Sequence, residues 1–337
     1  MSQDLKEEDL KNSLMAKIQE DLEKIEKSLR KNLNAQLELV QDIAGHLLFG
    51  KGKRLRPLLM INSAKMCGYH GNAESEQSII DLAIVFEYLH AATLLHDDVI
   101  DEADMRRGKK AAHKIWDSPK VILTGDFLLA RSLSITAKTE NIRIISTIAN
   151  ITEEMSQGEI DQLNQKNRLD LSEEHYFSII RRKTAVLIEG ACKCGALFAG
   201  ASKEREEALF NYGHNLGMAF QMADDLLDYT SDAKTLGKKP GADLREGKLT
   251  LPLIKTIERA GKKDKDKIEK IVQAIEFSQT DFEELVSMIV EYNGIEYTQG
   301  KALEYVKNAK TCLAIFESSE HKELLTQLAD YSIKRKV

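Results

Sequence analysis

The sequence contains little proline and cysteine and a single tryptophan. Its 337 residues include four prolines, and the stretches between them are rich in alanine, leucine, glutamate, lysine and isoleucine. That composition favours an all-helical protein. The four cysteines show no paired metal-ligand spacing, so we expect free buried thiols rather than a zinc site or disulfides.

The chain also lacks the features of several functional classes. A formal net charge of -6 argues against nucleic acid as a partner, although basic residues cluster at 51–56, 106–110 and 181–183. We find no apolar run that approaches the roughly 20 residues of a membrane span, so we predict no integral membrane segment. The charged N-terminus does not resemble a secretory or transit peptide, and we expect a cytoplasmic protein.

Apolar residues recur at helical spacing along nearly the whole chain. Residues 1–45 are typical of one amphipathic helix with a packing or dimer-contact role. Further helices are expected at about 57–66, 74–101, 119–137, 140–165, 172–199, 203–230, 251–260, 264–275, 279–291, 295–317 and 320–333. No long segment alternates with the period of a strand, and no change of composition divides the chain. We therefore predict a single all-α domain over residues 1–337, a helical bundle enclosing a central cavity.

One acidic pattern, Asp-Asp-x-x-Asp, occurs twice in apolar, helix-like sequence. We call residues 97–101 the first acidic motif and residues 224–228 the second acidic motif. On a helix, the first and last aspartates of each motif lie about 40° apart around the axis and share a face. Neighbouring carboxylates in apolar surroundings repel each other and require cations, and Mg²⁺ accepts one or two carboxylates together with phosphate oxygens. The alternative for either motif alone is a solvated acidic face.

Basic residues near glycines complement the acidic motifs. Residues 50–57, Gly-Lys-Gly-Lys-Arg-Leu-Arg-Pro, place four cations before a helix, where an anion can bind. Arg106-Arg107-Gly108 follows the first acidic motif, and Lys183, Lys238 and Lys248 occur later. A solvated loop is the alternative for such a charge run. Together the acidic and basic groups suggest two diphosphate-bearing substrates, one bound through Mg²⁺ and one held by lysine and arginine.

Six motifs occur in a characteristic order. They are GKRLRP at 52–57, LLHDDVIDEADMRRG at 94–108, GDFLLARS at 125–132, KTA at 183–185, FQMADDLLDY at 220–229 and LGKKPGADLREGKLTLP at 236–252. In this order they resemble the trans-isoprenyl diphosphate synthases, also called polyprenyl synthetases. The stretch EYLHAATLLHDD at 87–98 is most similar to long-chain members such as octaprenyl diphosphate synthase, which make quinone side chains. One departure is Lys51-Gly52 in place of the usual double glycine.

The resemblance implies an isoprenoid-synthase-type bundle of antiparallel helices around a deep cavity, normally a homodimer. It also implies a role for each matching residue. Asp97 and Asp101, supported by Asp98, would bind two Mg²⁺ ions, and Asp224, with Asp228 nearby, a third. Arg106, Lys183 and Lys238 would hold the allylic diphosphate, with Thr184 and Gln221 at its reacting end. Lys53, Arg56, His90 and Arg107 would hold isopentenyl diphosphate, and Lys248 would help to close the site.

The implied reaction is head-to-tail condensation of isopentenyl diphosphate with an allylic diphosphate such as farnesyl diphosphate. It proceeds by ionisation, condensation and loss of a proton, and it needs no side-chain nucleophile. His96 is either a proton acceptor or a structural neighbour of the first acidic motif. The alternatives are a geranylgeranyl or farnesylgeranyl diphosphate synthase, a class I terpene cyclase and a non-catalytic partner subunit. The two complete acidic motifs argue against the last two.

Helix geometry extends the prediction to product length. Thr93, Leu89 and Phe86 lie one to three turns before Asp97 on its face, with Ala92 beside them, and should line the path of the growing tail. Ala92 and Thr93 are small, so we expect an open path and a product longer than farnesyl. Phe86, about 16 Å from Asp97 along the helix, is either a deeper stop or ordinary core.

Overall fold

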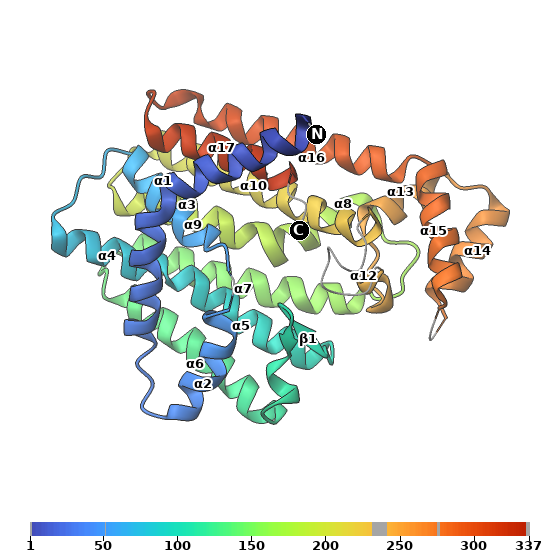
Figure 1. Cartoon of the computed structure of the whole chain (residues 1–337), viewed down its shortest axis with the longest axis horizontal. Helices are drawn as coiled ribbons and strands as arrows, with labels where there is room; N and C mark the ends of the chain where they lie inside the picture. Colours follow the sequence, from blue (N-terminus) through green and yellow to red (C-terminus); the bar gives the residue numbers. More distant parts are fainter. Residues whose placement is uncertain (1, 51, 231–240, 275–276, 335–337) are drawn as a thin grey trace. The chain divides into compact units, whose positions relative to one another are not determined.

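Apolar residues at helical spacing form helices over most of the chain in the structure, a computed structural model that describes residues 2–50, 52–230, 241–274 and 277–334 (Figure 1). Of residues 2–17, 73 and 334 only the backbone is described. The α-helices are α1 (Ser2–Leu33), α2 (Glu38–Leu48), α3 (Leu55–Met66), α4 (Ala73–Ala83), α5 (Val85–Ile100), α6 (Ser118–Ala137), α7 (Ile142–Asn164), α8 (Glu173–Ile180), α9 (Val186–Phe198), α10 (Lys203–Thr230), α12 (Ala242–Arg245), α13 (Leu251–Arg259), α14 (Lys262–Val272), α15 (Gln279–Glu291), α16 (Gly294–Cys312) and α17 (Glu320–Lys334). Shorter elements are the 3₁₀ turns η1 (Ala112–Lys114) and η3 (Leu313–Ile315), the π turn η2 (Arg181–Ala185), and the hairpin strands β1 (Met105–Arg106) and β2 (Lys109–Lys110).

Three predicted helices are interrupted in the structure, and this corrects the sequence prediction. The single helix expected over residues 1–45 is two helices, because the chain leaves the helical conformation at Asn34, where φ is 28°. The helix expected over 74–101 is divided at Ile84 into α4 and α5. The helix expected over 172–199 contains the π turn η2. The helix expected over 203–230 has the predicted boundaries, as α10.

The chain divides into two compact units, each with its own buried apolar residues. The first unit comprises residues 1–153, 187–213 and 312–328, and the second unit comprises residues 154–186, 214–311 and 329–337. In the first unit α5 packs most extensively against α6, while α2, α3 and α4 also contact α5. In the second unit α13 contacts α8 and α15, and α14 contacts α15. The single domain over residues 1–337 stays a prediction.

One apolar stretch corrects the expectation about membrane spans. Residues 74–100, with a window of mean hydropathy 1.6, are long and apolar enough to cross a membrane by length and composition alone. In the structure 72% of that window is buried. No other helix in the described ranges meets the same criterion.

Candidate active site

The first acidic motif lies at the C-terminal end of α5. Asp101 is the C-cap residue of this helix, and its N–H donates to the carbonyl oxygen of Asp97 over 2.8 Å. The two aspartates are therefore one turn apart, as predicted, and both are partly exposed. Asp98 lies about 100° further around the helix than Asp97 and is buried. The motif thus combines two accessible carboxylates with one buried carboxylate.

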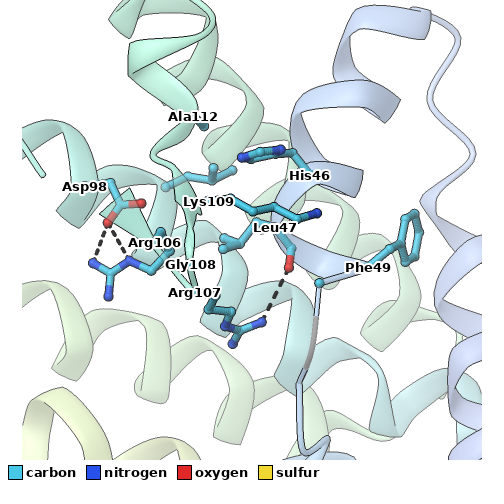
Figure 2. Close-up of a pocket in the computed structure, with 11 residues that line it drawn as sticks. His46, Leu47, Phe49, Asp98, Arg106, Arg107, Gly108, Lys109 and Ala112 are labelled. Carbon is cyan, nitrogen blue, oxygen red and sulfur yellow. Dashed lines mark hydrogen bonds and ion pairs between the residues drawn. The ribbon is translucent and has the colours of Figure 1, made fainter. Parts of the chain in front are cut away.

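A tight hairpin after α5 positions Arg106 and Arg107. Between β1 and β2, Arg107 and Gly108 have φ values of 52° and 75°, and this left-handed pair matches the twist of a two-residue hairpin. Arg106 Nε donates to Asp98 Oδ1 over 2.7 Å, and Arg106 Nη2 donates to the same oxygen (Figure 2). The guanidinium therefore balances the charge of the buried carboxylate, and the carboxylate fixes the guanidinium.

A cavity of about 420 Å³, the first cavity, lies beside this hairpin in the first unit. It is lined by His46, Leu47, Phe49, Gly50, Leu95, Asp98, Arg106, Arg107, Gly108, Lys109 and Ala112 (Figure 2). Arg107 Nη1 donates to the carbonyl oxygen of Leu47 over 3.4 Å. The sequence did not predict that His46 and Phe49 line this cavity. Its only signal was their position just before the basic loop.

Arginines concentrate positive charge around His90 on α5. Burial and the charges of Arg56, Arg107, Arg106 and Arg54 hold the pKa of His90 well below its usual value of 6.5. The imidazole is therefore neutral at pH 7. A neutral imidazole among several guanidinium groups is an environment that favours a bound anion.

The basic loop before α3 divides its cations between two tasks. Arg54 is 3% exposed and has a φ of 48° at the N-cap of α3. Its guanidinium donates to Glu26 over 2.6 Å, to Glu87 over 3.1 Å and to the carbonyl oxygen of Leu48. Arg54 therefore anchors the loop. Lys53, which is exposed, and Arg56, which is partly buried, stay the predicted isopentenyl diphosphate ligands.

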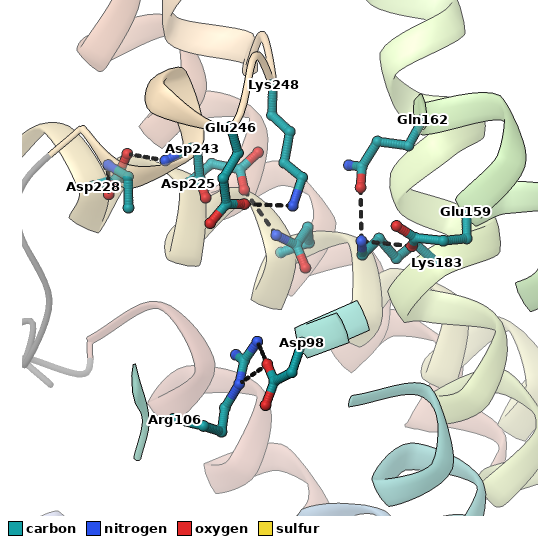
Figure 3. A network of polar contacts seen from close by, with 12 residues as sticks. Asp98, Arg106, Glu159, Gln162, Lys183, Asp225, Asp228, Asp243, Glu246 and Lys248 are labelled. Carbon is teal, nitrogen blue, oxygen red and sulfur yellow. Dashed lines mark hydrogen bonds and ion pairs between the residues drawn. The ribbon is translucent and has the colours of Figure 1, made fainter. Parts of the chain in front are cut away.

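The second acidic motif lies near the end of α10, and its three aspartates have unlike surroundings. Asp224 is partly buried, whereas Asp225 and Asp228 are 3% and 1% exposed. Asp228 Oδ1 accepts the N–H of Ala242 over 3.2 Å, and Oδ2 accepts the N–H of Asp243 over 3.0 Å (Figure 3). Both oxygens thus bind the first backbone groups of α12. The role of Asp228 as a metal ligand stays a prediction. Its contact with α12 was not predicted from the sequence.

Each carboxylate oxygen of Asp225 accepts a hydrogen bond from a neighbouring side chain. Tyr176 Oη donates to Asp225 Oδ2 over 2.6 Å, and Gln221 Nε2 donates to Oδ1 over 2.7 Å. Thr184 Oγ1 donates to Gln221 Oε1 over 2.7 Å, so the structure brings these two predicted residues together. Burial and the nearby charge of Asp243 raise the pKa of Asp225 to about 7.

Lys183 and Thr184 belong to the π turn η2. The turn packs closely against two glycines, because an added Cβ would lie 2.7 Å from Arg182 Cβ at Gly158 and 2.5 Å from Ala185 Cα at Gly217. Single π turns of this kind occur frequently at functional sites. The glycines therefore permit a backbone conformation that presents Lys183 and Thr184 differently from a regular helix.

Two predicted lysines of the second unit are held by acceptor side chains. Lys183 Nζ donates to Glu159 Oε2 and Gln162 Oε1, both over 2.6 Å, and Lys248 Nζ donates to Glu246 Oε2 over 2.6 Å (Figure 3). A second cavity of about 110 Å³ is lined by Gln162, Gln165, Leu171, Tyr176, Ile179, Ile180, Lys183, Thr184, Gln221, Asp225, Asp243, Lys248, Leu249 and Thr250. Lys238 lies outside the residues that the structure describes.

The predicted tail-binding residues line one stretch of α5. Phe86, Leu89 and Ala92 are buried, whereas Thr93 is partly exposed and donates its hydroxyl to the carbonyl oxygen of His90 over 2.9 Å. An added Cβ at Gly190 would lie 3.5 Å from Phe86 Cε1, so the Phe86 ring packs against α9. Both interpretations of Phe86, as a stop for the tail and as core, agree with this packing.

His96 contacts α6. Its Nε2 lies 3.0 Å from the carbonyl oxygen of Ile122 and 3.4 Å from Asp126 Oδ1, and an added Cβ at Gly125 would lie 2.3 Å from the same nitrogen. These contacts favour the structural interpretation of this histidine.

The carboxylates suit a metal ion that the substrate helps to bind. Within the described ranges, no three histidine, cysteine, aspartate or glutamate side chains converge on one point, as an all-protein metal site would require. Mg²⁺ is usually bound by one or two carboxylates, with water and phosphate oxygens in the other positions. The partly exposed pair Asp97 and Asp101 fits that pattern.

Comparison with known proteins agrees with these features. Residues 37–289 match the sequence model of the family Polyprenyl synthetase. The chain is 34% identical to octaprenyl diphosphate synthase of Haemophilus influenzae, over 94% of each chain, and 35% identical to geranylgeranyl diphosphate synthase of Methanosarcina mazei, over 86% of this chain and 88% of that one. It superimposes with a TM-score of 0.90 on a polyprenyl synthase from Caulobacter crescentus in complex with calcium and isoprenyl diphosphate, at 36% identity over 97% of this chain and 98% of that one.

These similarities confirm the predicted all-α isoprenoid synthase fold and the predicted enzyme class. The family uses isopentenyl diphosphate and allylic diphosphates as substrates. The chain therefore belongs to the polyprenyl synthetase family of prenyltransferases.

Proposed function

We propose that the protein condenses isopentenyl diphosphate head to tail with an allylic diphosphate and produces a long all-trans polyprenyl diphosphate. The observation that carries this proposal is the group of arginines around neutral His90, on the same helix as the partly exposed pair Asp97 and Asp101. One helix thus combines a site for a directly bound diphosphate with a carboxylate pair for a metal-bound diphosphate.

Asp97, Asp101 and Asp224 would hold about three Mg²⁺ ions, with Asp228 as a further candidate. When bound, Mg²⁺ neutralises charge on a departing diphosphate. In the first unit, Asp98 orients Arg106 toward its predicted role at the allylic diphosphate. Arg107, Arg56, His90 and Lys53 are the proposed ligands of isopentenyl diphosphate, and the low pKa of His90 leaves its ring neutral, so that it can donate one hydrogen bond without an added charge.

In the second unit, Lys183, Lys248 and the pair Thr184 and Gln221 are the proposed contacts of the allylic substrate. Lys183 is held between Glu159 and Gln162 at 2.6 Å from each, which orients its ammonium group before substrate arrives. Lys238 keeps its predicted role at the allylic diphosphate.

The product length rests on the small residues Ala92 and Thr93, one turn before the first acidic motif. The relative named octaprenyl diphosphate synthase favours a long product, whereas the relative named geranylgeranyl diphosphate synthase favours a shorter one. The test is incubation of the purified chain with Mg²⁺, labelled isopentenyl diphosphate and farnesyl diphosphate, with reverse-phase sizing of the dephosphorylated product. A product that stops at geranylgeranyl would establish the shorter-chain alternative, and no diphosphate release by the chain alone would favour a partner subunit.

Ala92→Phe is expected to shorten the product by several isoprene units, because the added ring would fill the proposed path of the tail. Equal product lengths from wild type and Ala92→Phe, measured by the same chromatography, would contradict this tail path.

A homodimer is proposed from an exposed apolar face on α6. Ile122 and Leu123 are 40% and 66% exposed, and Leu133, about 20° around the helix from Ile122, is 48% exposed. Apolar residues that gather on one exposed helix face are typical of a subunit contact. Sedimentation velocity of the purified chain tests this assembly. A cytoplasmic location and a quinone side chain as destination stay predictions.

A further inference from the structure

Tyr176 lies on α8, outside the motifs that suggested the substrate contacts. Its side chain is 3% exposed, and its hydroxyl donates to Asp225 Oδ2 over 2.6 Å. The other Asp225 oxygen accepts Gln221 Nε2, and the Gln221 carbonyl oxygen accepts the Thr184 hydroxyl, each over 2.7 Å. All four side chains line the second cavity. A continuous row of hydrogen bonds therefore leads from Tyr176 to Thr184.

With Asp225 ionised, the direction of these bonds is fixed at its carboxylate. A carboxylate can only accept hydrogen bonds, so Gln221 must turn its NH₂ group toward Asp225. The Gln221 carboxamide oxygen therefore faces Thr184. Thr184 has one hydroxyl hydrogen, and the carboxamide oxygen accepts it. What Thr184 can offer to a ligand in the second cavity is therefore a lone pair. The reversed row would instead present a hydrogen, which repels positive charge.

We infer that Tyr176 is a positioning residue for the condensation, which holds Asp225 and thereby orients Gln221 so that Thr184 offers a lone pair to positive charge at the allylic end of the substrate. The inference rests on the proposed function, because it requires a reaction in which positive charge develops. A group that is already oriented before the reaction stabilises such charge without reorganisation cost. Tyr176 acts through Asp225 and Gln221.

The test is Tyr176→Phe, which removes one oxygen atom and keeps the ring. We expect kcat to fall roughly tenfold, with unchanged KM values for isopentenyl diphosphate and the allylic diphosphate, because the row acts on developing charge and not on diphosphate binding. The matched control is Tyr297→Phe, since Tyr297 Oη also donates to a carboxylate of the second unit, Glu173 Oε1, over 2.7 Å. The control should keep the wild-type kcat.

A double-mutant cycle with Gln221→Leu separates this role from general support of the structure. If Tyr176 acts through Gln221, Tyr176→Phe will cause no further loss of kcat in the Gln221→Leu background. An independent second loss, or a kcat for Tyr176→Phe equal to that of Tyr297→Phe, would overturn the inference. Should Tyr176→Phe fail to fold by circular dichroism, Asp225→Asn, which removes an acceptor oxygen from the same row, carries the same prediction.

The assay also distinguishes this inference from the proposed function. Wild-type turnover with any allylic diphosphate, whatever the product length, supports the condensation, and the variants then decide the role of Tyr176. Absence of wild-type turnover with geranyl, farnesyl and geranylgeranyl diphosphate would overturn the proposed function, and the inference with it.

Discussion

The two acidic motifs share one sequence pattern but differ in what surrounds their middle aspartate. In the first acidic motif, Asp98 is buried against the guanidinium of Arg106. In the second, Asp225 is buried against the neutral hydroxyl of Tyr176 and the neutral amide of Gln221. Burial and the charge of Asp243 raise the pKa of Asp225 to about 7, since no cation balances it in these contacts. The same residue type therefore orients a cation in one motif and a row of neutral groups in the other.

The last aspartates differ as well. Asp101 is partly exposed at the end of α5, whereas Asp228 is buried and binds the backbone N–H groups that begin α12. Spacing along a helix determines which carboxylates share a face, but the packing around the helix determines which of them a metal can reach. The metal roles of these aspartates stay predictions.

The largest expected effect tests what the motifs have in common. Asp97→Ala and Asp224→Ala should each lower turnover by about 10³-fold, because each removes a carboxylate proposed to hold a metal ion that stabilises the departing diphosphate. Incorporation of labelled isopentenyl diphosphate measures this, and circular dichroism should show an unchanged helix content. Asp104→Ala is the control, since the Asp104 side chain is 87% exposed. Normal turnover in either variant would rule out the shared role.

The next effect tests the difference between the middle aspartates. Arg106→Gln should lower the free energy of unfolding by about 3 kcal/mol, because it leaves the buried Asp98 carboxylate without its counter-charge. Tyr176→Phe, which removes one neutral donor from Asp225, should cost only about 1 kcal/mol. Urea unfolding followed by circular dichroism measures both. In the variant Arg106→Gln with Asp98→Asn most of the loss should be recovered, and equal losses in the single and double variants would contradict the charge argument.

A smaller effect compares the last aspartates. Asp228→Ala should lower the free energy of unfolding by about 2 kcal/mol, because two backbone N–H groups of α12 lose their buried acceptor. Asp101→Ala should change it by less than about 0.5 kcal/mol, since a carboxylate at the C-terminal end of a helix faces the negative end of the helix dipole. Chemical unfolding of the two variants in parallel decides the comparison. Similar losses in both would mean that the two aspartates are equally structural.

Periodicity in the sequence predicted most helices, because an apolar stripe is a local property of the chain. It did not predict the π turn at residues 181–185, whose conformation depends on close contact with Gly158 and Gly217 from other helices. The predicted meeting of Thr184 with Gln221 came from family resemblance, and their partner Tyr176 was missed because no spacing rule links it to Asp225. The contact of Asp228 with α12 was missed for the same reason. Spacing within one helix could be predicted, and contacts between helices could not.

The last effect, which is seen only at acid pH, concerns a pH dependence that burial and the nearby arginines give to the first unit. Burial, together with the charges of Arg56, Arg107, Arg106 and Arg54, holds the pKa of His90 well below 6.5, so the folded protein keeps this ring neutral while the unfolded chain protonates it below that pH. Protons then bind preferentially to the unfolded chain, so the stability that His90 contributes is present above pH 6.5 and is lost as the pH falls. The loss should approach about 1.4 kcal/mol per pH unit. His90→Gln, which cannot titrate, should flatten the pH dependence of urea unfolding below pH 6.5, and an unchanged slope would show that the folded protein does not keep His90 neutral.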